Sequence, residues 1–161
     1  MRRHAPTAFN SVSNSNLGTG TLWLVTIPRL VLGTIFAAAA LNYFWSVVFG
    51  SMLVPVSVTS QGMQFAGMII KTGYLWPLMK SINLAAGILL ITNRVPAFAV
   101  ALLLPVTVII VWFQVFLNPL PVPMGTAAVE VVCELLLLRA YANRYAGMFT
   151  NDASRTREPI R

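Results

Sequence analysis

The sequence predicts an all-α integral membrane protein, a four-helix bundle of antiparallel up-down topology with both termini on the cytoplasmic side. The first observation is composition: 57% of the 161 residues are hydrophobic and 9% are charged, against about 45–50% and about 25% in a typical soluble domain. The second is a series of four apolar segments near spanning length. The third is the gathering of positive charges at one end of these segments. Most of the surface must therefore face lipid or other protein.

Each of the four segments has close to the roughly 20 apolar residues that cross a bilayer as a helix. The first is longer than needed and contains Pro28, so we expect it to tilt, bend near the proline or protrude. The connection 118–123 alternates proline with other residues, which predicts a tight extended turn without helix. Short connections make consecutive helices antiparallel neighbours. The transmembrane domain is predicted over 22–146, with spans at about 22–49, 74–92, 95–117 and 124–145.

Three further segments complete the predicted organisation. Residues 1–21 are rich in Ser, Asn, Thr and Gly without apolar periodicity, which predicts a polar tail, and residues 147–161 form a basic C-terminal tail. The longest connection, 50–73, begins as an extended segment. Its second half places Met and Phe beside Gln and Lys71, which favours a helix lying at the membrane interface.

The charges and the aromatic residues orient the predicted bundle. Four spans place both tails and the 92–95 turn on one side and the two other connections on the opposite side, where Lys71 is the only basic residue. Cytoplasmic segments carry an excess of Lys and Arg, so the tails are expected in the cytoplasm. Trp and Tyr prefer the headgroup level, and most lie near predicted helix ends. The arginines of the first side are Arg2, Arg3, Arg94, Arg144, Arg155, Arg157 and Arg161.

The usual metal ligands are scarce in this chain. Cys133 is the only cysteine and His4 the only histidine, so an internal disulfide, an all-protein iron–sulfur site and paired-imidazole haem ligation are excluded. We expect no cofactor held covalently or by metal ligands, and we expect Cys133 to be a small packing residue. The net charge of +7 comes from the two ends and not from a stripe interleaved with aromatics, which predicts contact with lipid and no nucleic-acid partner.

Ionisable residues inside the predicted spans are the candidates for function, because a charge at membrane depth costs about 2.5–3.5 kcal/mol on insertion scales. At about 1.5 Å per residue, Lys80 and Glu130 both lie roughly 10 Å below the outer interface, and Glu134 lies one turn deeper. One interpretation is structural: Lys80 pairs with Glu130 and Arg29 with Glu134, and the pairs only fix helix packing. The other is a polar pocket for a quinone head group or a proton, lined by Lys80, Asn83, Gln114, Glu130 and Glu134.

Three stretches resemble the DoxX-like family of small four-helix membrane proteins: Arg29–Phe36, the run from Gly73 through Lys80 to Leu90, and Arg94 with Pro96 and Leu104–Val106. The resemblance covers most of the chain from about Arg29 to Pro119. It implies a four-helix fold in a bacterial-type inner membrane and a connection with thiosulfate and quinone oxidoreduction or other membrane redox assemblies. The chain departs from the family where members often carry an acidic residue and a histidine, and here has Asn83 and Gln114. Any role that needs a carboxylate or an imidazole at those positions is in doubt.

Two functions follow as hypotheses. The resemblance and the small loops favour a non-catalytic accessory or structural subunit of a larger membrane electron-transfer complex, with lipid and other protein chains as partners. The alternative is a quinone-linked or proton-handling subunit of an oxidoreductase that uses the buried Lys80, Glu130 and Glu134, with quinone or lipid as its ligand. A transporter or channel is less favoured because the sequence lacks paired inverted repeats and broken half-helices.

Overall fold

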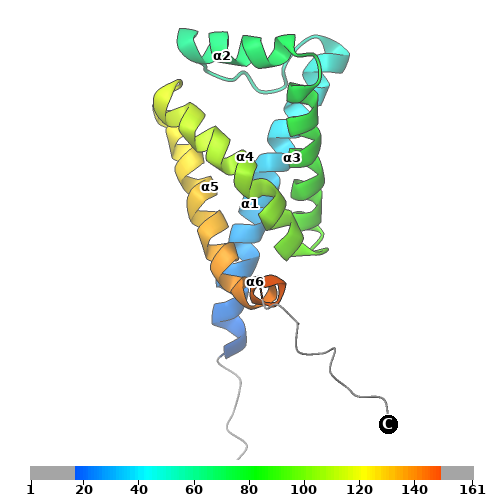
Figure 1. Cartoon of the computed structure of the whole chain (residues 1–161), viewed down its shortest axis with the longest axis vertical. Helices are drawn as coiled ribbons and strands as arrows, with labels where there is room; N and C mark the ends of the chain where they lie inside the picture. Colours follow the sequence, from blue (N-terminus) through cyan, green and yellow to red (C-terminus); the bar gives the residue numbers. More distant parts are fainter. Residues whose placement is uncertain (1–16, 150–161) are drawn as a thin grey trace, which may run out of the picture.

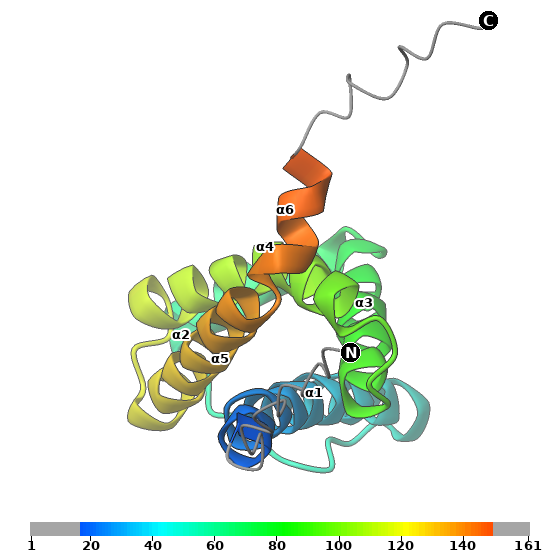
Figure 2. The same cartoon turned by 90° about the horizontal axis from the view of Figure 1, so that it is seen from below.

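The computed structural model describes residues 17–149, and side chains over 23–145. All regular structure in this range is helical. Four long helices run along the length of the molecule, α2 lies across one end, and α6 lies at the other (Figure 1). Viewed along its length, α1, α3, α4 and α5 stand around a common centre (Figure 2). The helices are α1 (Leu17–Phe49), α2 (Ser60–Lys71), α3 (Leu75–Ile91), α4 (Pro96–Phe116), α5 (Pro121–Ala140) and α6 (Ala142–Phe149).

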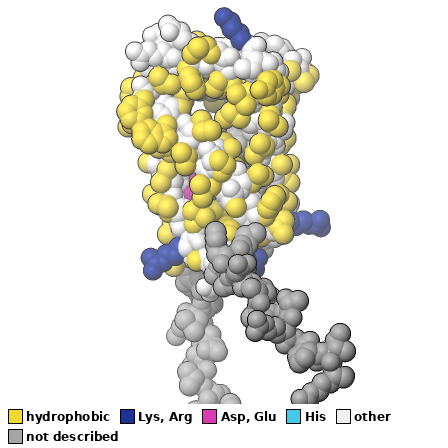
Figure 3. All heavy atoms as spheres, viewed as in Figure 1, with side chains coloured by type: hydrophobic (Ala, Val, Ile, Leu, Met, Phe, Trp, Pro, Cys, Tyr) yellow, Lys and Arg dark blue, Asp and Glu magenta, His cyan; other side chains and the backbone are white. Residues whose placement is uncertain are grey.

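Three helices of the described range are long and apolar enough to cross a membrane: Trp23–Phe49 of α1, and α4 and α5. The 17 residues of α3 span only about 25 Å, and α3 reaches spanning length only together with α2, from which it is bent by 96°. Hydrophobic side chains cover the middle of the visible face, while Lys and Arg lie toward its ends (Figure 3). The chain is therefore a multi-pass membrane protein with three or four candidate spans.

The first helix is longer than the sequence predicts. α1 begins at Leu17, so the last part of the predicted tail 1–21 is helical, and residues 1–16 lie outside the described range. The helix continues through Pro28, and its 33 residues correspond to about 50 Å. Since the hydrocarbon core is about 30 Å thick, α1 is long enough to protrude from the membrane.

The fourth predicted span, 124–145, is two helices in the structure. α5 begins at Pro121, so the prediction that 118–123 contains no helix is wrong from that residue onward. Proline is tolerated in the first turn of a helix, where its missing N–H would have no intrahelical partner. α5 ends at Ala140, and α6 follows and continues past residue 146 to Phe149. The Tyr145 hydroxyl donates a hydrogen bond to the Ala97 carbonyl at 2.6 Å, which fastens α6 to the beginning of α4. The rest of the predicted C-terminal tail, 150–161, lies outside the described residues.

The connection 50–73 contains a helix in its second half, as predicted. α2 begins after Thr59, whose hydroxyl accepts a hydrogen bond from the Gly62 N–H at 3.1 Å and so caps the helix. The first half is extended and is fastened to α1 by the Asn42 side chain, which donates to the Val54 carbonyl and accepts from the Val54 N–H, each at 3.0 Å.

α1 and α3 cross closely at two glycines. A Cβ added to Gly87 would lie 2.8 Å from the Gly33 carbonyl oxygen and 2.9 Å from the Ala37 nitrogen, both backbone atoms. Small residues allow such close packing, which is a main source of helix association in lipid. The core continues from this crossing into α4 and α5 and includes Cys133, which is a packing residue as predicted. Its most buried members are Leu32, Phe36, Ala86, Leu90, Ala99, Val100, Leu103 and Leu137.

We expect Gly87→Ala to destabilise the protein by about 1–3 kcal/mol, because the added methyl group meets backbone that cannot move aside without separating α1 from α3. The measurement is a reversible unfolding titration in detergent micelles. Gly67→Ala is the matched control, since a Cβ there meets open space. Equal stability of the two variants would contradict the close crossing.

Candidate functional site

The inward face of α5 carries the only two acidic side chains of the described range. Glu130 and Glu134 lie one turn apart, on the same face as Ala127 and Leu137. Glu130 is 6% exposed and Glu134 is 4% exposed. Both carboxyl groups are therefore turned away from lipid and into the space between the helices.

Several polar atoms of this interior have no hydrogen-bond partner in the described residues. They come from α1, α3, α4 and α5, so the set is assembled only by the tertiary fold. An unpartnered buried polar group costs about 1–3 kcal/mol and is rare in native proteins. We call these residues the interior polar cluster. Its unpartnered atoms are Arg29 Nε, Asn83 Oδ1, Thr107 Oγ1, Glu130 Oε2 and Glu134 Oε1.

Neither predicted ion pair forms a hydrogen-bonded contact among the described residues. Arg29 Nε and Glu134 Oε1 both lack partners, as does Glu130 Oε2. Lys80 and Glu130 come from α3 and α5, which each pack mainly against α1 and α4 and not against each other. Neither predicted pair is therefore in direct contact in the part of the chain that the structure describes.

Lys80 and Asn83 line a small cavity of about 70 Å³ where α2, α3 and α4 meet. The Lys80 ammonium lies over the Trp76 ring, 5.4 Å from its centroid, a cation–π arrangement that stabilises the charge. Phe65 of α2 and Phe113 of α4 also line this cavity. The cavity is large enough to hold water molecules, one of which needs about 10–15 Å³ by this measure.

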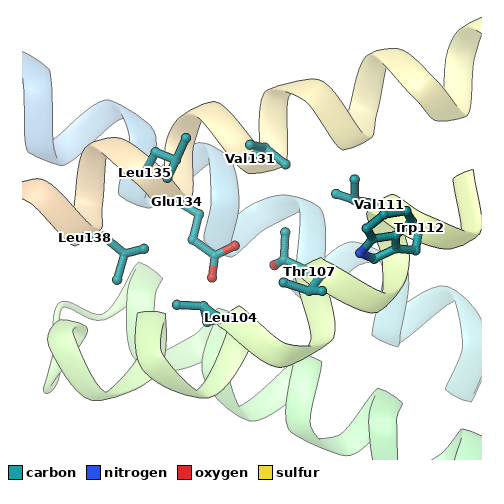
Figure 4. A pocket seen from close by; sticks show the side chains of 9 residues that line it. Leu104, Thr107, Val111, Trp112, Val131, Glu134, Leu135 and Leu138 are labelled. Atoms are coloured by element: carbon teal, nitrogen blue, oxygen red, sulfur yellow. The ribbon is translucent and has the colours of Figure 1, made fainter. Parts of the chain in front are cut away.

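Glu134 instead lines a larger groove between α4 and α5. The groove has a volume of about 270 Å³ and is otherwise almost wholly apolar. The Glu134 carboxyl group and the Thr107 hydroxyl point toward one another across its floor, flanked by Leu104 and Leu138, while Trp112 lies toward one end (Figure 4). We call this the α4–α5 groove. The five residues of the predicted pocket are thus divided between two cavities and the surrounding interior.

Gln114 lies outside both cavities and has a structural contact instead. Its Oε1 accepts a hydrogen bond at 3.0 Å from the Asn118 side chain, which is 1% exposed. Asn118 Oδ1 accepts from the Thr59 N–H at 2.9 Å, and the Thr59 hydroxyl donates to the Leu117 carbonyl. Gln114 therefore lines neither of the two cavities, and it supports a clamp that ties α2 to the α4–α5 turn.

Sequence reasoning missed two residues of these arrangements, Thr107 and Asn118. Thr107 is the only hydroxyl-bearing residue of α4, and an isolated polar residue in an apolar span was the available signal. Asn118 lies in a turn, where asparagine is common for local reasons. Its contacts with residues 59 and 61 positions earlier leave no local pattern.

Comparison of the chain with protein-family models, with curated proteins and with solved structures found no match. In the described residues, no group of three or more His, Cys, Asp or Glu side chains is arranged to hold a metal ion. The polar interior and the two cavities are the features of the described residues that bear on function.

Asn118→Ala is expected to loosen the clamp, because it leaves the partly buried Thr59 N–H without its acceptor at a cost of about 1 kcal/mol. Hydrogen exchange followed by mass spectrometry should show faster exchange over 57–62 and little change in the middle of α1. Thr126→Ala is the control, since that exposed hydroxyl bonds only within its own helix. Unchanged exchange over 57–62 in Asn118→Ala would argue against the clamp.

Proposed function

We propose that this protein is a quinone-linked or proton-handling subunit of a membrane oxidoreductase, with four spans and both termini in the cytoplasm of a bacterial-type cell. The observation that supports this most is the pair of buried carboxyl groups on α5, each with an oxygen that has no hydrogen-bond partner in the described chain. They lie in a helix apolar enough to cross the membrane.

The free-energy cost of placing an ionisable group inside a membrane is the reason to connect these carboxyl groups with function. Ionisable groups inside a membrane are rare, and those that persist commonly mark ion, proton or substrate paths. A purely structural ion pair would be expected to satisfy its own hydrogen bonds, whereas one buried oxygen of Glu130 and one of Glu134 have no hydrogen-bond partner in the described residues. A carboxyl group can take up or release a proton, and quinone chemistry couples electron transfer to proton uptake and release. The two carboxyl groups therefore suit such a reaction.

The four-span topology is supported by how α3 packs. Its buried residues include Asn83, Ala86, Gly87 and Leu90, which lie along one face against α1, and α1 and α3 share the most extensive helix contact. The described arginines near the helix ends, Arg94, Arg139 and Arg144, are exposed. All three belong to the end of the molecule opposite α2 and Lys71, the arrangement expected if that end is cytoplasmic.

An accessory, non-catalytic role in an electron-transfer complex is the second candidate. It is favoured by the resemblance to the DoxX-like family and by the extended segment before α2. That segment presents apolar side chains that are all more than half exposed at the end of the molecule: Met52, Leu53, Val54 and Val56. Contiguous exposed apolar side chains of this kind are typical of contacts with another protein chain.

The proposed topology predicts opposite labelling of two single cysteines introduced into a Cys133→Ala background. A cysteine at Thr92 should react with a membrane-impermeant maleimide only in inverted vesicles, and a cysteine at Ser51 only in intact cells or spheroplasts, because the two positions lie at opposite ends of α1 and α3. Both positions are exposed. Labelling of both from the same side would contradict the four-span arrangement.

Replacement of either carboxyl group tests the proposed function in membranes that contain the protein with its native partners. Glu134→Gln and Glu130→Gln should each lower quinone-dependent electron transfer by about 100-fold or more, the lower end of the contribution of a positioned proton-transfer group. Lys71→Gln is the matched control because Lys71 is exposed at the end of α2 and should retain full activity.

Measurements on the same membranes distinguish the accessory role from the quinone-linked function. Unchanged quinone-dependent activity in both glutamine variants would reject the quinone-linked function. If redox subunits still co-purify with those variants in fixed ratio in mild detergent, the accessory role is the one supported. A single monodisperse chain without partners would count against the accessory role.

A further inference from the structure

The α4–α5 groove opens sideways into the bilayer. Val108, Trp112 and Leu135, which line it, are between 46% and 60% exposed. Both helices are apolar enough to span the membrane, so these exposed side chains face lipid. In the space-filling view, an acidic side chain is visible among the hydrophobic side chains of this face (Figure 3). A molecule dissolved in the membrane can therefore enter the groove without crossing the aqueous phase.

The groove lies in the hydrocarbon part of the membrane and not among the lipid head groups. At about 1.5 Å per residue, Glu134 on its floor lies about 20 Å from Pro121 and about 9 Å from Ala140 along α5. Head groups lie outside the hydrocarbon core, which is about 30 Å thick. A ligand at Glu134 must therefore be soluble in hydrocarbon, which excludes the choline group of a phospholipid.

The groove carries one charge-bearing group in otherwise apolar surroundings. Among the residues that line it, Glu134 is the only ionisable one, and all the others except Thr107 are hydrophobic. The Glu134 carboxyl group points into the groove (Figure 4), and its Oε1 has no partner in the described residues. The attraction between opposite charges grows as the dielectric constant falls. The groove is therefore complementary to a positive charge.

The walls select the kind of cation. Glu134 is only 4% exposed, so its carboxyl group is recessed and acts on a ligand mainly through space. A primary ammonium has three N–H donors that need acceptors, and the hydrophobic walls offer none. A quaternary ammonium or phosphonium has no such donor. The Trp112 ring at one end of the groove adds a face that attracts cations of this kind.

We propose that the α4–α5 groove binds lipophilic quaternary cations, ammonium or phosphonium, with Glu134 as the counter-charge and Trp112 against the ligand. The groove has a volume of about 270 Å³, just below the roughly 300–1,000 Å³ of sites for drug-sized molecules, and its open side lets part of the ligand remain in lipid. The inference goes beyond the proposed function and does not depend on it, because binding requires only the carboxylate and the shape of the groove.

The test is equilibrium binding of tetraphenylphosphonium to the full chain in nanodiscs of zwitterionic lipid, corrected for partition into empty nanodiscs. Tetraphenylborate has nearly the same size and shape but a negative charge, so it should bind at least about tenfold more weakly. Glu134→Gln keeps the side-chain size and removes the charge, and should weaken phosphonium binding at least about tenfold, equivalent to about 1.4 kcal/mol. Trp112→Leu should weaken it about threefold through loss of the aromatic face.

A second pair of variants tests the location of the ligand. Leu135→Trp fills the groove from its exposed side and should weaken phosphonium binding at least about tenfold. Leu136→Trp is the matched control, since this neighbour does not line the groove and binding should be unchanged. Both leucines are exposed, so neither substitution disturbs the core.

Equal binding of the two tetraphenyl ions, or equal phosphonium binding by Glu134→Gln and the unmodified chain, would make the groove an apolar surface for acyl chains and overturn the proposal. Equal binding by Leu135→Trp and Leu136→Trp would overturn the assignment to this groove. If the phosphonium binds the purified chain but not the chain in its native membranes, a partner helix fills the groove there and the proposal also fails. Loss of quinone-dependent activity in Glu134→Gln without loss of phosphonium binding would reject the cation site and leave the proposed function standing.

Discussion

The close crossing of α1 and α3 is the contact on which the rest of the arrangement depends. Lipid tails are as apolar as leucine, so helices in a membrane gain little from hiding hydrophobic surface and associate instead through close packing. Gly33 and Gly87 allow the two backbones to meet. Arg29 precedes the first glycine by one turn and Asn83 precedes the second. Because the two helices are antiparallel, these polar residues lie on opposite sides of the crossing, about 12 Å apart along the helices.

The glutamates of α5 divide in the same way. α5 runs in the same direction as α3 (Figure 1), so Glu130 is nearer the α2 end and Glu134 is one turn nearer the α6 end. Glu130 therefore lies at about the same depth in the bundle as Lys80 and Asn83. Glu134 lies deeper and faces Thr107 in the groove. This separation explains why one continuous polar pocket does not form and why two cavities of different character do. The smaller is lined by a cation and aromatic rings, and the larger by a carboxyl group, mostly aliphatic side chains and Trp112.

The clamp around Asn118 closes the end of the molecule on the α2 side. It joins the start of α2 to the α4–α5 turn through backbone and side-chain hydrogen bonds, and Phe65 of α2 lies against Phe113 of α4 with ring centroids 5.8 Å apart.

The sequence by itself determined the helical class, the approximate place of every long helix, and the ionisable residues that lie within them, because apolar length and rare intramembrane charges are local properties of the chain. It did not determine which polar residues meet. Lys80 and Glu130 match in depth but belong to helices that do not pack against each other. Thr107 is opposite Glu134 only because α4 and α5 present those faces to each other, and Gln114 is held by Asn118. Depth follows from counting residues along a helix, whereas contact depends on helix rotation and neighbour order, which only the packing of the whole fold decides.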